Sequence, residues 1–267
     1  MQWVSHLLQR LQTGPAVLVS VLATRGSVPR DAGTWMAVFA TDLVATVGGG
    51  RLEQDAIDHA RTLLARGPGV PEQHSFSLGP SLGQCCGGEV QLQFEWVSAQ
   101  DAATLAQRLA PVHTPVALFG GGHVGQALVR VLGLLPVDLL WVDSRDEVFP
   151  KHLPANVHAE HSEPVEAAVP GLAAGSRVFI MSFSHAEDFS VVAACLQRQR
   201  LQGDLPYIGL IGSKTKWATF RHRLEARGFS AQELDQVTCP IGVPGIADKR
   251  PEVIAVAAAA QLLQVGV

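Results

Sequence analysis

The sequence lacks an apolar run long enough to cross a membrane. Its most apolar stretch, residues 253–267, is interrupted by Gln261 and Gln264 and stays below the roughly 20 apolar residues that a spanning helix needs. The N-terminus also lacks a basic segment followed by an apolar core and a cleavage site, because polar residues such as Arg10 interrupt it. We therefore expect a cytoplasmic protein that makes no use of a membrane.

Charged residues are also few. They make up 16% of the chain, its formal net charge is −4, and it contains no block of Lys and Arg. Because a surface for nucleic acid or anionic lipid needs clustered positive charge, both kinds of partner are excluded. Hydrophobic residues, at 47% of the chain, predict a sizeable core, and their excess favours a homodimer.

Cysteine is scarce, which excludes a disulfide framework. Of the four cysteines, Cys195 lies in an apolar helical stretch and is expected to be a buried core thiol. Cys85 and Cys86 are adjacent and bracketed by glycines, in a turn where burial does not explain them. Their candidate roles are a ligand for a soft metal, a sulfur carrier or a vicinal disulfide, and an inert thiol pair is the alternative. A zinc site is disfavoured because no C-x-x-C spacing is present.

A glycine-rich turn dominates the second half of the chain. Residues 116–119 form an apolar run typical of a buried strand, and residues 124–132 have helical periodicity. Three glycines occupy the G-x-G-x-x-G frame of a dinucleotide-binding turn: Gly120, Gly122 and Gly125. A second apolar run ends in Asp143, where such a fold places the acid that accepts a ribose hydroxyl. Because Arg145 follows closely and could accommodate a phosphate there, the choice between NAD and NADP stays open.

Strands and helices alternate over the second half, as a doubly wound parallel sheet requires. Strands are expected at residues 116–119, 137–142, 157–160, 177–182, 207–211 and 237–241. His123 follows the first of these strands and His185 the fourth, with Asp188 close behind. Ligands bind at the carboxyl ends of the strands in such sheets, so we expect both histidines in a site there. The prediction is a Rossmann-like domain over residues 116–267.

The first half predicts a separate α/β domain with a small mixed sheet, over residues 1–97. Strands are expected at residues 16–23, 35–40, 43–47, 74–78 and 89–97, and helices at 1–11 and 51–64. Residues 98–115 are expected to form a linking helix and the domain boundary. The chain is thus predicted to be α/β, an N-terminal α/β domain followed by a Rossmann-like doubly wound parallel sheet.

Two loops of the first domain have the composition of an anion site. Residues 24–31 are polar and contain guanidinium and hydroxyl groups that suit an oxyanion: Arg25, Ser27 and Arg30. A glycine turn between a strand and a helix could offer free backbone amides at the positive end of the helix dipole: Gly48, Gly49 and Gly50. The alternatives are a solvated loop and a turn that merely needs positive φ.

Five segments, in this order, resemble the XdhC/CoxI family. They are residues 26–30, 48–53, 78–88, 120–125 and 208–214. The doubled cysteine of the third segment and the Val-Asp-Ser-Arg stretch at 142–145 look most like the XdhC members of the family. The likeness runs from about Thr24 to Leu263, nearly the whole chain, and five ordered motifs are far more specific than a glycine turn alone.

The resemblance implies an accessory protein and not an enzyme. Proteins of this family bind the molybdopterin-type molybdenum cofactor, hold it while a cysteine desulfurase supplies a sulfido ligand, and deliver it to an apo molybdenum hydroxylase such as xanthine dehydrogenase. Here Cys85 or Cys86 would contact the metal side of the cofactor. One competing interpretation is an NAD(P)-dependent oxidoreductase with His123 or His185 as acid or base, and another is a pure protein-interaction module. The Rossmann-like domain could bind a nucleotide, the pterin cofactor or neither.

Overall fold

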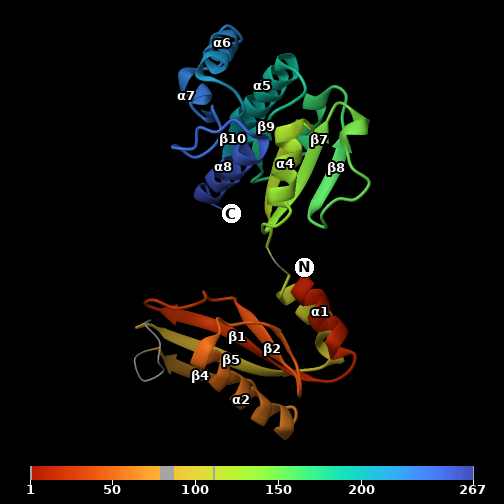
Figure 1. Cartoon of the computed structure of the whole chain (residues 1–267), viewed down its shortest axis with the longest axis vertical. Coiled ribbons are helices and arrows are strands. Elements are labelled where there is room, and N and C mark those ends of the chain that lie inside the picture. The colour runs from red at the N-terminus through yellow and green to blue at the C-terminus, as the bar shows by residue number, and fades with distance from the viewer. Residues whose placement is uncertain (1, 79–86, 111, 267) are drawn as a thin grey trace. The chain divides into compact units, whose positions relative to one another are not determined.

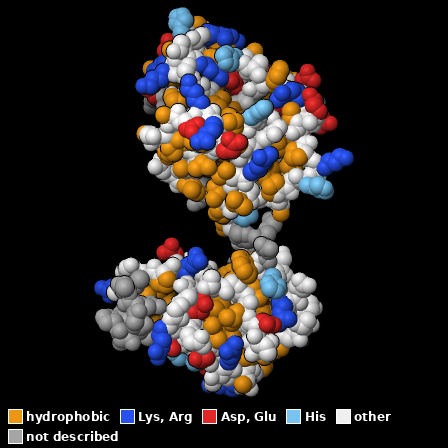
Figure 2. Space-filling model, viewed as in Figure 1, with side chains coloured by type: hydrophobic (Ala, Val, Ile, Leu, Met, Phe, Trp, Pro, Cys, Tyr) orange, Lys and Arg blue, Asp and Glu red, His pale blue; other side chains and the backbone are white. Residues whose placement is uncertain are grey.

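A computed structural model describes residues 2–78, 87–110 and 112–266 of the chain (Figure 1). The chain divides into two compact units, Met1–Pro111 and Val112–Val267. Within the described ranges, no helix is long and apolar enough to cross a membrane. Side chains of both charges appear on the visible face of each unit (Figure 2).

The first unit is built on a five-stranded sheet in the order β3-β2-β1-β5-β4. Its strands are β1 (Ala16–Arg25), β2 (Trp35–Val38), β3 (Leu43–Ala45), β4 (Glu72–Ser77) and β5 (Glu89–Val97). All described pairings are antiparallel, where the sequence led us to expect a mixed sheet. For β1, β2 and β3 the reason is that they follow one another without a helix between them, and short connections of this kind pair neighbours in opposite directions.

Helices cover both faces of this sheet. They are α1 (Gln2–Leu11), α2 (Gly50–Arg66), the short 3-10 helix η2 (Ala99–Asp101) and α3 (Ala102–Arg108). Side chains of β1 alternate between the faces, so that Val17 and Val19 pack in the core with α2, and Leu18 packs with Leu7 of α1 and Leu105 of α3. The helix expected to link the domains therefore contributes to the core of the first unit.

The second unit is a six-stranded parallel sheet in the order β11-β10-β9-β6-β7-β8. Its strands are β6 (Thr114–Phe119), β7 (Val137–Asp143), β8 (Val157–His161), β9 (Arg177–Ile180), β10 (Tyr207–Leu210) and β11 (Val237–Thr238). The chain enters at β6, moves outwards through β7 and β8, and then crosses back to β9 on the other side of β6. This is the doubly wound Rossmann order, which confirms the prediction, and its switch point lies between β6 and β9.

Each face of the parallel sheet has its own core. The helices are α4 (His123–Leu132), α5 (His185–Gln202), α6 (Lys214–Glu225), α7 (Ala231–Leu234) and α8 (Pro251–Gln264), with short 3-10 helices η3 (Asp146–Val148) and η4 (Val165–Gly171). Helices α4 and α8 pack on one face, and α5, α6 and α7 on the other. Cys195 of α5 is fully buried in the second of these cores. Burial raises the pKa of its thiol to about 12, as expected for a core cysteine.

Candidate functional site

Three segments that the sequence analysis singled out meet in the first unit. A Cβ atom added at Gly88 would lie 2.5 Å from the carbonyl oxygen of Ser27 and 2.6 Å from that of Arg25. A Cβ atom added at Gly48 would lie 2.8 Å from Cβ of Pro29. Because real Cβ atoms do not approach so closely, only glycine lets these segments come into contact at the two positions. The arginine loop (residues 24–31) therefore packs against the glycine turn (residues 48–50) on one side and against the end of the cysteine loop (residues 78–88) on the other.

The cysteine loop (residues 78–88) ends beside Arg25. The amide of Leu78 donates a hydrogen bond of 2.7 Å to the carbonyl oxygen of Gly88, which closes the loop at its base. Glu89, the next residue, is opposite Arg25 in the pairing of β1 with β5. Cys85 and Cys86 themselves lie outside the described residues, so the structure locates the two ends of their loop and not the thiols.

Arg25 and Arg30 are available for an anion. Both are exposed, with Arg25 as the last residue of β1 and Arg30 in the loop that follows. Four other arginines of the first unit form ion pairs with carboxylates: Arg10, Arg51, Arg66 and Arg108. Neither Arg25 nor Arg30 pairs with an acid among the residues that the structure describes. Ser27 lies between them and is also exposed.

The glycine turn between β3 and α2 differs from the free amide cradle that we expected. Its three glycines have φ values of 127°, 78° and 68°, which only glycine adopts readily. However, the Gly49 amide donates to the Glu53 carboxylate at 3.1 Å, and the Gly48 amide donates to the Thr46 hydroxyl at 3.1 Å. These two amides are therefore already in use, a role for Glu53 and Thr46 that the sequence analysis missed. Helix α2 begins at Gly50, its N-cap residue Gly49 has no side chain to cap it, and the Glu53 carboxylate lies in its first turn.

In the second unit, the three glycines of the G-x-G-x-x-G turn have different surroundings. A Cβ atom at Gly120, where φ is 124°, would lie 2.0 Å from the carbonyl oxygen of Met181, and one at Gly125 would lie 2.1 Å from the carbonyl oxygen of Gly120. These two positions are needed for the tight turn and for helix–strand packing. A Cβ atom at Gly122 would meet no described atom within 4 Å. Gly122 is the N-cap of α4, has no side-chain cap, and leaves open space where a phosphate could approach.

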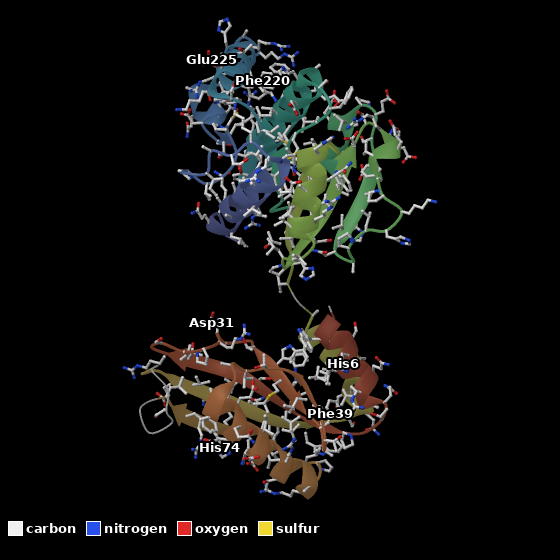
Figure 3. All side chains as sticks on the ribbon, viewed as in Figure 1. His6, Asp31, Phe39, His74, Phe220 and Glu225 are labelled. Atoms are coloured by element: carbon white, nitrogen blue, oxygen red, sulfur yellow. The ribbon has the colours of Figure 1, made fainter. Side chains whose placement is uncertain are left out.

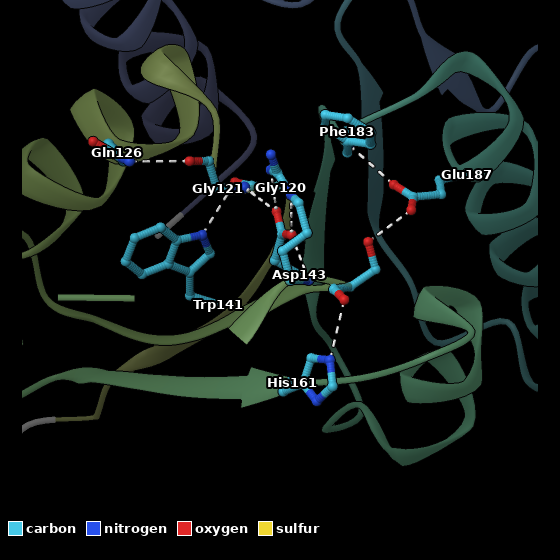
Figure 4. Close-up of polar contacts among 10 residues, drawn as sticks. Gly120, Gly121, Gln126, Trp141, Asp143, His161, Phe183 and Glu187 are labelled. Carbon is cyan, nitrogen blue, oxygen red and sulfur yellow. Dashed lines mark hydrogen bonds and ion pairs between the residues drawn. The ribbon is translucent and has the colours of Figure 1, made fainter. Parts of the chain in front are cut away.

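Asp143 is not a free ribose acceptor in this structure (Figure 4). It is 1% exposed, and one of its oxygens accepts a hydrogen bond of 2.5 Å from the amide of Gly121. The other accepts from the amide and Nε of Arg145, both at 2.9 Å, and this carboxylate raises the pKa of the guanidinium. Asp143 thus fastens the glycine turn to the end of β7, and a ribose hydroxyl would have to displace one of these donors. The sequence pattern alone does not reveal that the carboxylate of Asp143 is already hydrogen-bonded, because the bond from Gly121 depends on a contact between the ends of two strands.

The two candidate histidines lie at the switch point. His123 is the first residue of α4 and His185 the first residue of α5, and both are exposed. Their helices follow β6 and β9, which are neighbours in the sheet. The sequence-based expectation that both histidines follow the carboxyl ends of strands at one sheet edge is confirmed. Neither imidazole makes a hydrogen bond or ion pair with another described residue that could act as a catalytic partner.

A buried ion pair lies beside this edge. Asp188 is 2% exposed and accepts from the Ser182 amide at 2.7 Å and from Lys216 Nζ at 2.5 Å. Lys216 also donates to the carbonyl oxygen of Ile211 at 2.9 Å. Burial raises the pKa of Asp188, although Lys216 and the amide of Ser182 oppose that shift. Lys214, the last residue of the family-like segment 208–214, is exposed, and Lys216 is the residue that ties the ends of β9 and β10 together.

Two family models match the chain. One is described as the XdhC Rossmann domain and covers residues 116–262. The other is described as the XdhC and CoxI family and covers residues 10–76. The first match alone covers more than half of the chain.

Two known proteins resemble the chain along nearly its whole length. Protein YqeB of Escherichia coli (strain K12) is 24% identical over 257 residues, which are 95% of this chain and 44% of that protein. The chain therefore spans less than half the length of this relative. A crystal structure described as a xanthine dehydrogenase from Bacillus halodurans has a TM-score of 0.77 and 19% identity, covering 98% of this chain and 95% of that one. The second likeness shows a shared fold.

Proposed function

This chain belongs to the XdhC and CoxI family, and from that premise we propose that it is an accessory protein in the maturation of a molybdenum hydroxylase. It binds the molybdopterin-type molybdenum cofactor and holds it while a cysteine desulfurase partner adds the sulfido ligand. It then passes the cofactor to apo xanthine dehydrogenase or a related enzyme. In this proposal the chain itself acts as a carrier and not as a catalyst.

The observation that supports the proposal best is the meeting of the arginine loop, the Gly48 turn and the base of the cysteine loop in the first unit. Molybdopterin has an anionic phosphate at one end and sulfur ligands to the metal at the other. Arg25 and Arg30, which have no acidic partner among the described residues, suit the first, since guanidinium groups form charge-assisted hydrogen bonds to phosphate oxygens. A thiolate suits the second, since sulfur ligands prefer soft metals. One small region of the chain thus combines both chemistries.

Each residue has a distinct part in this proposal. Arg25 and Arg30 bind the phosphate, and the Ser27 hydroxyl donates a further hydrogen bond. Cys85 or Cys86 holds the metal side of the cofactor.

The test is equilibrium binding of molybdenum cofactor to the full chain without oxygen. Replacing Arg25 and Arg30 together by alanine should weaken binding by about 2–3 kcal/mol, roughly 30–150-fold, because a hydrogen bond to a charged group contributes about 1.5–3 kcal/mol and these are exposed. Arg61→Ala is the matched control, since Arg61 is an exposed arginine elsewhere in the first unit. Replacing both Cys85 and Cys86 by alanine should shorten retention of the cofactor.

Opposite results would refute the proposal. If the double arginine variant and the double cysteine variant both bind as the Arg61→Ala control does, the first unit is not the cofactor site.

Delivery of the cofactor is tested separately, as the gain of hydroxylase activity by apo xanthine dehydrogenase. If sulfuration precedes delivery, this gain should require a desulfurase and a sulfur donor.

A second candidate function is nucleotide binding by the second unit, as in an NAD(P)-dependent oxidoreductase. The strand order and the open space at Gly122 favour it. The occupied carboxylate of Asp143 argues against an ordinary ribose contact. Saturable binding of NADH or NADPH that His123→Ala or His185→Ala weakens, together with turnover of a substrate, would favour this candidate, and absence of both would remove it.

A further inference from the structure

Three metal-binding side chains meet in the first unit, outside the site described above. We propose that His59, Glu72 and His74 bind one divalent transition-metal ion, with Zn²⁺ as the expected occupant. His59 lies on α2, and Glu72 and His74 lie on β4, the edge strand of the sheet. Figure 3 labels His74, which lies next to α2. This site requires neither the molybdenum cofactor nor the cysteines.

The fold directs the three side chains towards one another. Glu72 and His74 are two residues apart on a strand, so both point to the same face of the sheet. Glu72 is opposite Phe94 in the pairing of β4 with β5, and Phe94 is buried in the core beneath α2. The shared face is therefore the one that α2 covers, and His59 extends to it from that helix.

The distances match a metal site. Nε2 of His59 lies 3.3 Å and Nε2 of His74 lies 3.4 Å from the same carboxylate oxygen of Glu72, Oε2. One candidate ligand atom from each residue lies within 4.8 Å of the others. In a tetrahedral zinc site with bonds of about 2.1 Å, ligand atoms are about 3.4 Å apart. Only a small adjustment would bring the three atoms around one ion.

Hydrogen bonding occupies these atoms only weakly, since Nε2 of His74 meets Oε2 of Glu72 at 3.4 Å, longer than an ordinary hydrogen bond. Nη1 of Arg66 binds the other oxygen of Glu72, Oε1, at 2.8 Å, which orients the carboxylate and leaves Oε2 towards the two imidazoles. Nε2 of His59 is buried and makes no hydrogen bond to any described residue, although it lies 3.3 Å from that carboxylate oxygen. A buried imidazole nitrogen without a hydrogen bond is costly, and a metal ion would supply a bond to it. The three side chains are 29%, 33% and 44% exposed, so an ion can reach them from solvent.

The surroundings indicate an open coordination position. Phe94 stands edge-on to both imidazoles, with ring centroids 4.7 Å from His59 and 5.6 Å from His74, and gives the site an apolar wall. A pocket of about 400 Å³ shares Arg66, Glu72 and Phe94 with the site. Three protein ligands leave a fourth position for water or an external ligand. Two imidazoles and one carboxylate favour Zn²⁺, Co²⁺ or Ni²⁺ over Mg²⁺ and Ca²⁺, which prefer oxygen ligands alone.

The experiment is titration of the tag-free full chain with Co²⁺ and with Zn²⁺, in a background where Cys85 and Cys86 are replaced by serine. We expect one Co²⁺ per chain, with visible absorption bands of a tetrahedral or five-coordinate ion and no thiolate charge-transfer band. Zn²⁺ should displace it. His59→Gln and His74→Gln should each weaken binding by more than about tenfold, since even outer-shell partners of metal ligands contribute 10–100-fold.

The matched control is His158→Gln, because His158 and Asp138 form a similar exposed pair, at 3.3 Å, in the second unit. It should leave the affinity unchanged. If His59→Gln does not fold, His74→Gln at the exposed edge strand still decides the question. Absence of stoichiometric binding, or equal binding by the His74→Gln variant and the control, would overturn the proposal. Since no molybdenum cofactor is used, this result is independent of the proposed function.

Discussion

Replacing Gly88 by alanine should loosen the first unit at the base of the cysteine loop. The added Cβ would lie 2.5 Å from the Ser27 carbonyl oxygen and 2.6 Å from the Arg25 carbonyl oxygen. Neither oxygen can rotate away without moving the end of β1, which is paired with β5. The neighbouring Gly87 is the matched control, because a Cβ there would meet no atom of a described residue within 4 Å and neither glycine has a positive φ.

The size of the effect follows from these contacts. Forcing extra atoms into a packed position costs about 1–3 kcal/mol, and two immobile backbone oxygens put Gly88 at the upper end. Separating β1 from the loop would also strain the hydrogen bond from Leu78 to Gly88, worth about 0.5–1.5 kcal/mol. The total of about 3–4 kcal/mol is a large part of the 5–15 kcal/mol that stabilises a typical domain. Gly87→Ala should change stability by less than about 1 kcal/mol.

Amide hydrogen exchange is the appropriate assay, because the chain has two units and a global probe would average them. In Gly88→Ala, amides of β1 and β5 should lose exchange protection equivalent to about 3–4 kcal/mol. The protection of β6 and β7 in the second unit should stay unchanged and provides an internal reference. The reasoning is refuted if Gly88→Ala protects β1 and β5 as well as Gly87→Ala does. The backbones at Ser27 and Gly88 would then be farther apart than described.

Two further predictions concern the second unit. Gly125→Ala should destabilise it by about 1–3 kcal/mol, measured as lost exchange protection of the β6 and β7 amides, since its Cβ would lie 2.1 Å from a backbone oxygen. Gly122→Ala should stay within about 1 kcal/mol of wild type, because its Cβ would meet no described atom within 4 Å, and equal protection in both variants would contradict the described turn. Hydrogen bonds from Arg200 and from the cap of α7 lower the pKa of Glu233 from 4.5 to about 2. The stability that these hydrogen bonds contribute is complete above about pH 4.5 and is lost as the pH falls towards 2. Glu233→Gln should therefore flatten the decline of the second unit's urea midpoint over that window. A decline as steep as that of wild type would count against the Arg200–Glu233 ion pair.

Most of the elements were predictable because their side-chain patterns are local. The alternation of apolar and polar residues in β5 predicted its bounds, Glu89–Val97, without error. The glycine fingerprint, followed by an apolar run ending in Asp143, predicted the order strand, turn, helix, strand that opens the second unit. The direction of pairing in the first sheet was less predictable, since a strand pattern indicates which face is buried and not which neighbour the strand has.

The candidate sites were predictable only in part. Arg25, Ser27 and Gly48 were identified from residue type, and the structure adds that their segments are in contact. The partners of the chemistry-bearing groups were missed. Nothing in the sequence near Asp143 indicates that Gly121 donates to it, and nothing near Glu72 indicates that His59 faces it across the gap between a helix and a strand.

The sequence by itself determined the α/β class, the Rossmann-like second half and the family likeness, because periodicity, glycine spacing and ordered motifs are properties of consecutive residues. Tertiary structure alone decided which polar groups are free. The carboxylate of Asp143 is occupied by an amide 22 residues away in the chain, and Arg25 stands without an acidic partner among the described residues. Such occupancy depends on distances between segments that the chain brings together only when hydrophobic burial packs its strands and helices, so it cannot be deduced from residue type at either position.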